Sequence, residues 1–197
     1  MRTTARSRPH LAIRARSREL SVASATSRGG APSDLETDIS SAPRKQRLSN
    51  AVAVCAPQEH HFDAWAALFR PYRVFYKLTP DEAIVERVWS WIHDPGHETN
   101  ALLAIEDAQV IGLAHYRRFA RPSTGSVGLW LDDLFTDPEH RGNGIGRTLI
   151  NTIADLSKRN DCSVVRWITA ADNLPGQRLY DTFATKPTWI TYDKTPW

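Results

Sequence analysis

The stretch LWLDDLFTDPEHRGNGIGRTLI, residues 129–150, decides the fold class of this chain. Its first part is an apolar run typical of a β-strand, although it carries two adjacent carboxylates, Asp132 and Asp133. Its last part begins an apolar-periodic segment that predicts a helix over 146–159. Between them lie three glycines at every second position: Gly142, Gly144 and Gly146. The order of strand, glycine loop and helix indicates an α/β (α+β) fold.

The glycine loop indicates an anion site. A glycine has no Cβ, so a ligand can approach its backbone closely. The following helix supplies free N–H groups and the positive end of its dipole, a combination that binds phosphate. Arg141 and Arg147 flank the loop and would add charge-assisted contacts. The spacing GxGxG matches neither the nucleotide pattern GxxxxGK[ST] nor the dinucleotide pattern GxGxxG, so both of those phosphate ligands are excluded.

Periodicity outside this stretch predicts a mixed sheet with helices on its faces. The segments with strand patterning are 51–56, 101–107, 109–118, 125–135, 163–170 and 189–194. Helical spacing covers 62–76, 80–93, 146–159 and 172–183. Pro71 is expected to break or kink the first helix, and Thr79 to cap the second. The segment 163–170 is nearly all apolar, as in a strand buried on both faces. We therefore expect six to seven strands and about four helices.

The chain divides by composition near residue 48. Residues 1–48 contain 10 of the 25 basic side chains, 4 of the 22 acidic ones and no aromatic residue. Such a segment is expected to be disordered. It suits a solvated extension, an organelle transit peptide or, without interleaved aromatics, a nucleic-acid-binding arm. The remaining 15 basic and 18 acidic residues make the body, 49–197, mildly acidic, which would suit a cationic substrate.

Several classes of protein are not expected. No segment approaches the roughly 20 apolar residues of a membrane span. Cys55 and Cys162 lack a motif, which favours a reducing compartment such as the cytoplasm over a disulfide scaffold. The histidines His60, His61, His93 and His97 do not predict a metal site, because a Pro-Gly step separates the last two and no cysteine joins them.

Several motifs in order resemble one family. RGNGIG, residues 141–146, matches the pattern [Q/R]xxGx[G/A], and 173–180 follows N-x-x-A-x-x-L-Y with Gly176 in place of Ala. LWLDDLF, PYRVFY and LYDTFATKPTWITYD also match in order. The chain thus resembles the GNAT superfamily of N-acetyltransferases over about residues 50–194, closest to the histone/polyamine acetyltransferase-like branch. It departs from the pattern at Ala184-Thr185, where Gly-Phe is usual.

The resemblance implies a GNAT domain at 49–197 that uses acetyl-CoA as cosubstrate, and a homodimer. The pantetheine would lie along the strand edge 134–136, with the amide of Leu134 or Phe135 facing the thioester oxygen. Asn173 and Tyr180 would complete the site. The full set of implied cofactor-binding residues is Leu134, Phe135, Thr136, Arg141, Gly142, Asn143, Gly144, Ile145, Gly146, Arg147, Asn173 and Tyr180.

A direct attack by a neutral primary amine on the thioester needs a general base and a general acid. Tyr180 is the expected acid, because a phenol pKa of about 10 is close to the thiol value of about 8.5. Asp132 is the first candidate base and Asp133 the second; each would bind the ammonium and pass its proton to water. Adjacent strand residues point to opposite faces, so only one should face the substrate unless a bulge intervenes.

The identity of the amine stays open among polyamines, small amines or amino acids, and protein lysines. Tyr72, Tyr76 and Tyr116 are candidate pocket residues by cation–π contact, although helical spacing makes the first two equally suited to the core. His115 is either a proton shuttle or a satisfied buried histidine. The alternative functions are a catalytically inactive acyl-CoA-binding sensor or structural subunit, and a chromatin- or nucleic-acid-bound acetyltransferase recruited by the basic tail. Neither a membrane nor a nucleic acid is the expected partner of the body.

Overall fold

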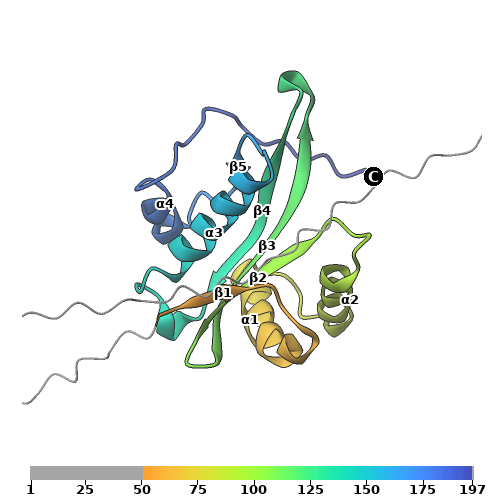
Figure 1. Ribbon diagram of the computed structural model, residues 1–197, viewed down its shortest axis with the longest axis vertical. Helices are drawn as coiled ribbons and strands as arrows, with labels where there is room; N and C mark the ends of the chain where they lie inside the picture. The colour runs from red at the N-terminus through yellow and green to blue at the C-terminus, as the bar shows by residue number, and fades with distance from the viewer. Residues whose placement is uncertain (1–50, 197) are drawn as a thin grey trace, which may run out of the picture. The chain divides into compact units, whose positions relative to one another are not determined.

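A computed structural model describes residues 51–196 (Figure 1). The predictions made for residues 1–48 lie outside the described residues. From Val52 onward the chain forms one compact unit. Among residues 51–196, no helix combines the length and the apolar character that crossing a bilayer requires.

The centre of this unit is a mixed five-stranded sheet. Its strands lie side by side in chain order: β1 (Ala53–Cys55), β2 (Asn100–Glu106), β3 (Gln109–Arg121), β4 (Ser126–Thr136) and β5 (Val165–Arg166). The first four pair antiparallel, whereas β5 runs parallel to β4. Single turns of 3-10 helix lie at Glu59–His61, Pro122–Thr124 and Pro138–His140. The mixed sheet and the α/β class predicted from the sequence are confirmed.

Helices cover both faces of the sheet (Figure 1). The described residues form four α-helices: α1 (Phe62–Phe75), α2 (Glu82–His93), α3 (Ile145–Arg159) and α4 (Leu174–Tyr180). Leu113 of β3 belongs to the core cluster formed with α1. A Cβ on its neighbour Gly112 would instead lie 2.8 Å from Ile145 of α3. Because adjacent strand residues point to opposite faces, α1 and α3 lie on opposite sides of the sheet.

The sheet has five strands among the described residues, so the prediction of six to seven is corrected. The expected buried strand 163–170 shortens to β5, and Ile168 beyond it is 61% exposed. The reason is that β5 pairs with β4 at only two positions before the chain diverges. No strand forms over 189–194, where Trp189, Ile190 and Tyr192 are exposed. Alternating apolar residues form a strand only beside a partner for their backbone groups.

Three features of the helices also differ from expectation. Pro71 lies within α1 and does not break it. Proline removes one helical hydrogen bond, and burial of the apolar face that includes Trp65 and Phe69 outweighs that loss. The cap of α2 is Asp81 rather than Thr79, because its carboxylate accepts from two amides of the first turn, the nearer at 2.9 Å. The last helix ends at Tyr180, three residues before the expected Phe183.

Candidate active site

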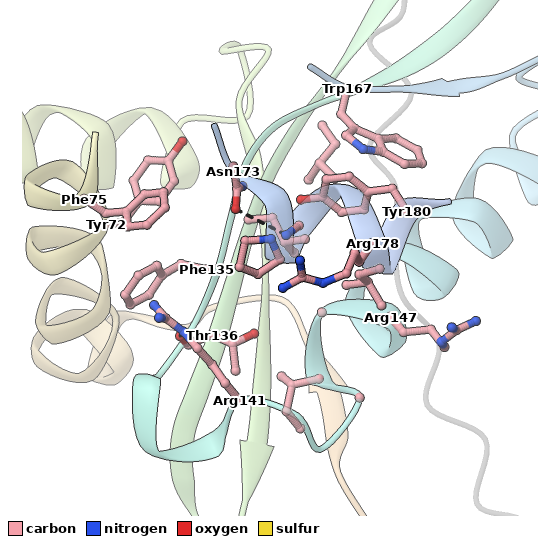
Figure 2. A pocket seen from close by; sticks show the side chains of 18 of the residues that line it. Tyr72, Phe75, Phe135, Thr136, Arg141, Arg147, Trp167, Asn173, Arg178 and Tyr180 are labelled. Atoms are coloured by element: carbon pink, nitrogen blue, oxygen red, sulfur yellow. Dashed lines mark hydrogen bonds between the residues drawn. The ribbon is translucent and has the colours of Figure 1, made fainter. Parts of the chain in front are cut away.

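A cavity opens where β4 and β5 diverge (Figure 2). The two strands are paired only at Leu129 and Trp130 of β4. Within the described part of the chain, the edge of β4 from 131 to 136 therefore has no strand beside it. The cavity has a volume of about 590 Å³ and is walled by this edge, the end of α1, the glycine loop, the segment after β5, and α4. An unpaired strand edge presents amides and carbonyls to whatever enters such a space.

The glycine loop forms one end of the cavity. Gly142 and Gly144 both have φ of +81°, the left-handed region that favours glycine. Gly144 is the N-cap residue of α3, and no side chain caps this helix start. The first amides of α3 have no acceptor within their own helix, so they are available to an anion. Gly146 has a different role, since a Cβ there would lie 3.3 Å from Leu179 of α4.

Arg141 and Arg147, which flank this loop in the sequence, lie in different orientations. Nε of Arg141 donates to the carbonyl of Thr136 over 3.2 Å, which holds this guanidinium at the cavity wall. Arg147 donates to Thr182 and lies over the ring of Phe183, so its head group points away from the cavity (Figure 2).

Arg178 extends from α4 into the cavity and was not selected from the sequence (Figure 2). The signal that would have found it is its position inside the 173–180 motif, on the same short helix as Tyr180.

Asn173 and Tyr180 lie at opposite ends of α4, and both line the cavity. The Asn173 carbonyl accepts from the amide of Gly176, and its amide donates to the Thr169 hydroxyl, so this side chain begins the helix. The Tyr180 ring lies edge-on to Trp167 at 5.4 Å between centroids. Burial raises the Tyr180 pKa above its ordinary value, and Tyr76 adds to this effect. The phenol therefore keeps its proton at neutral pH.

The two aspartates occupy a β-bulge in β4. Asp133 pairs with His115 of β3, whereas the next residue, Tyr116, pairs with Leu131, so Asp132 is the extra residue. Each carboxylate contacts a side chain of β3: Asp133 binds His115, and Asp132 binds Arg117. Those two residues are two apart on one strand and share a face of the sheet. The bulge, the exception allowed for in the sequence analysis, thus turns both carboxylates toward one face of the sheet.

Asp133 is held in a network under α1. One carboxylate oxygen accepts from the Tyr72 hydroxyl, and the other accepts from Nδ1 of His115 at 2.7 Å. Nε2 of His115 accepts from the indole N–H of Trp65 at 2.9 Å, which places the ring proton on Nδ1. His115 is 2% exposed, and both of its nitrogens are hydrogen-bonded. Both oxygens of Asp133 are occupied as well, and Asp133 does not line the cavity.

Asp132 does line the cavity and is open to it. Its side chain is 34% exposed and accepts one long hydrogen bond, 3.3 Å, from Nε of Arg117. Burial raises the Asp132 pKa above its ordinary value, and the positive charge of Arg117 opposes that effect. A carboxylate with a raised pKa and an accessible oxygen is a better proton acceptor than an ordinary surface aspartate.

Aromatic side chains at the end of α1 form part of the cavity wall. Tyr72 of α1 and Tyr76, the residue that caps this helix, line the cavity with rings edge-on at 5.1 Å between centroids, and Phe75 joins them, although the sequence did not single it out. Tyr116 does not line this cavity. It is 5% exposed, and it precedes Arg117 on β3, so its ring points to the opposite face of the sheet. Burial raises its pKa to about 12.

Of the cofactor-binding residues expected from the sequence, all but Asn143 line the cavity. Within residues 51–196, no group of three or more His, Cys, Asp or Glu side chains is placed to hold a metal ion. Two of the histidines considered in the sequence analysis have other contacts. Nδ1 of His93 is 3.0 Å from the carbonyl oxygen of Trp89, and the ring of His97 stacks on that of Trp91.

The family follows from comparison with known proteins. Residues 62–184, which contain the β4 bulge, the glycine loop and α4, match the model of the Acetyltransferase (GNAT) family. The chain belongs to this family. The chain is 24% identical over 152 residues to the D-amino-acid N-acetyltransferase HPA3 of Saccharomyces cerevisiae. This alignment covers 76% of the chain and 94% of the yeast protein.

Two solved structures illustrate the shared fold. A ribosomal-protein-alanine N-acetyltransferase from Brucella melitensis biovar Abortus 2308 superposes with a TM-score of 0.62 at 23% identity, covering 74% of this chain and 99% of that one. The aminoglycoside N-acetyltransferase AAC(6')-Iy in complex with CoA gives a TM-score of 0.63 at 16% identity. The superposition covers 79% of this chain and 99% of that one. These likenesses confirm the GNAT fold expected from the sequence. The narrower histone/polyamine branch stays a prediction.

Proposed function

We propose that this GNAT domain transfers an acetyl group from acetyl-CoA to a primary amine by direct attack in a ternary complex. One observation carries the proposal: a single cavity joins an unpaired strand edge, an uncapped helix start, an accessible carboxylate and a half-buried phenol. These are the groups that seating a pantetheine, binding a pyrophosphate, accepting a proton and donating a proton require.

Acetyl-CoA would enter along β4. Its pyrophosphate would accept from the first amides of α3 and from the loop, with Arg141 and Arg178 supplying positive charge. The pantetheine amides would pair with the free edge at 134–136, and Asn173 would face them from α4. An amide of that edge, from Leu134 or Phe135, would donate to the thioester oxygen as negative charge develops on it.

The reaction then needs two proton transfers. The amine nitrogen bonds to the carbonyl carbon, and the carbon–sulfur bond breaks. Asp132 receives the amine proton through water, and Tyr180 gives its proton to the departing thiolate. Asp132 rather than Asp133 takes the base role, because both oxygens of Asp133 are already hydrogen-bonded to Tyr72 and His115.

We assign the amine class as small amines or amino acids first, with polyamines and protein lysines as further candidates. HPA3 is named for D-amino acids, which supports a small substrate. The aromatic wall of Tyr72, Phe75 and Tyr76 would hold the apolar part of such an amine or its cation.

The chain is further proposed to act as a homodimer in a reducing compartment such as the cytoplasm. Exposed apolar side chains near the C-terminus, Trp189, Ile190 and Tyr192, support a second copy as the group that covers them. Cys55 and Cys162 are both free, which supports the compartment.

The test is amine-dependent thiol release by the full-length chain. Acetyl-CoA would be incubated with spermidine, a lysine-containing peptide, D- and L-amino acids and an aromatic amine. Removing one general acid or base costs about 100-fold or more in rate, so Tyr180→Phe and Asp132→Asn should each lower turnover by that order. Tyr192→Phe and Asp155→Asn are the matched controls, since both residues are exposed and neither lines the cavity. CoA binding without thiol release from any amine would instead favour an acyl-CoA sensor.

A further inference from the structure

Arg117 is a charged residue beside the site that the proposed reaction does not use. Its Nε contacts Asp132 at 3.3 Å, and its Nη1 lies 4.0 Å from Glu98, which is beyond hydrogen-bond distance. The guanidinium lies 6.0 Å from the centre of the Trp130 ring. Both Arg117 and Asp132 are 34% exposed. Among the described residues, its terminal amino groups thus donate no hydrogen bond, although Nη1 forms a long ion pair with Glu98.

An α-amino acid has the charges that match this pair. Its ammonium and its carboxylate are attached to the same carbon atom, a few ångströms apart. The negative Asp132 would face the ammonium, and the positive Arg117 would face the carboxylate. Nε of Arg117 lies 3.3 Å from Oδ1 of Asp132, a spacing similar to that between the two charges of the amino acid. A planar guanidinium whose two amino groups donate no hydrogen bond can bind a carboxylate through parallel hydrogen bonds, here in place of the long ion pair with the exposed Glu98. We propose that Arg117 binds the carboxylate of an amino-acid substrate while Asp132 binds its ammonium. This inference rests on the proposed acetyl transfer and names the substrate class for it.

The placement of the two charges also orients the substrate. Asp132 lines the cavity, whereas Arg117 lies next to it and outside the lining. An amino acid seated on both would direct its nitrogen toward the cavity, where the thioester would lie, and its carboxylate away from it. Reversing the substrate would place its carboxylate at Asp132, where like charges repel. The pair therefore selects the productive orientation as well as the charge pattern.

The same charges disfavour a polyamine. Among the described residues that line the cavity, Asp132 is the single carboxylate. The nearby Glu98 lies outside the lining, with its Oε2 4.0 Å from Nη1 of Arg117. A chain with several ammonium groups would have one of them at Asp132 and no carboxylate of the cavity lining for the others. An amino acid with an apolar side chain meets Tyr72 and Phe75 instead.

The experiment compares amino acids with the amines that lack only their carboxylate. Alanine is paired with ethylamine and phenylalanine with 2-phenylethylamine, each amino acid as both enantiomers. The full-length chain is assayed for kcat/KM with acetyl-CoA by thiol release. We expect the wild type to favour the better enantiomer of each amino acid over its paired amine. Arg117→Gln should lower that preference about tenfold or more, the loss that a charge-assisted hydrogen bond implies.

The controls separate carboxylate binding from general effects of charge. Arg118→Gln removes the same charge from the next residue of β3, which is exposed and on the opposite face, and should leave the preference unchanged. Arg117→Lys keeps the charge and should restore part of the preference. A wild type without any preference, or an Arg117→Gln variant that retains it, would overturn this inference while leaving acetyl transfer intact. Absence of thiol release from every amine would overturn the proposed function and this inference with it.

Discussion

At the bulge of β4, Asp132 and Asp133 differ in what surrounds them. Asp133 accepts from Tyr72 and His115, whereas Asp132 accepts one long hydrogen bond and is open to the cavity. The sequence predicted a carboxylate pair at a candidate site. It could not predict the bulge, because that depends on the register between β3 and β4, which no single residue specifies. Hence the face on which each carboxylate lies was open until the strands were paired.

The Asp133 network leads to a prediction about stability. Asp133→Asn keeps the shape of the side chain but replaces one acceptor oxygen by a donor. Because Tyr72 and the Nδ1 proton of His115 both donate to this residue, one of those hydrogen bonds would be lost. We expect the free energy of unfolding to fall by about 1–2 kcal/mol, measured by urea titration. Asp155→Asn, at an exposed position of α3, should change it by less than about 0.5 kcal/mol. An unchanged value for Asp133→Asn would contradict the network.

The pH dependence of activity should report Asp132. A general base works only when ionised, so kcat/KM should fall as pH drops through the Asp132 pKa, which burial raises above its ordinary value. Arg117 favours the ionised form and lowers that pKa. Removing its charge should therefore raise the pKa and move the acidic limb of the profile to higher pH. We would compare pH profiles of kcat/KM for Arg117→Gln and Arg118→Gln with an amine that lacks a carboxylate. A limb that stays in place, or that moves equally in both variants, would argue against Asp132 as the base.

Among the elements, those with a strong periodic pattern agreed with the sequence, and those that depend on a neighbour did not. The hairpin of β2 and β3 and the helix α3 formed where expected. The segment 163–170 had a continuous apolar run, yet only two of its residues pair with β4. The divergence that shortens β5 also opens the cavity edge, so the departure from pattern occurs at the candidate site. The glycine loop and α4 motif could be found from the sequence because each is contiguous.

Helix α1 carries a prediction at Pro71. This residue lies inside the helix and is exposed, so its ring costs a hydrogen bond without filling the core. Pro71→Ala should raise the free energy of unfolding by about 1–3 kcal/mol in a urea titration. Val74→Ala, at another exposed position of α1, serves as control and should have a small effect. A loss of stability in Pro71→Ala would instead mean that the proline sets the helix geometry that places Tyr72 against Asp133.

Over the whole molecule, the described unit leaves apolar surface exposed near its C-terminus. Trp189, Ile190 and Tyr192 are 79%, 76% and 88% exposed, values that are unusual for side chains of this size in a single copy. Their alternation predicted a strand, but a strand needs a partner edge, and none lies beside this segment among the described residues. A second copy of the chain would supply both an edge and apolar cover. The alternating pattern could be predicted from the sequence, whereas the edge that the proposed second copy would supply could not.

A dimer built on this segment should dissociate when its apolar side chains are removed. Ile190 and Tyr192 are two residues apart and would share one face of a strand, so Ile190→Ser and Tyr192→Ser are combined in one variant. We expect the wild type to sediment as a dimer at micromolar concentration and the double variant as a monomer. Thr191→Ser lies between them and should leave the dimer intact. A wild type that stays monomeric, or a double variant that stays dimeric, would contradict the role of this segment. Because the segment lies outside the cavity lining, the monomeric variant should still bind CoA.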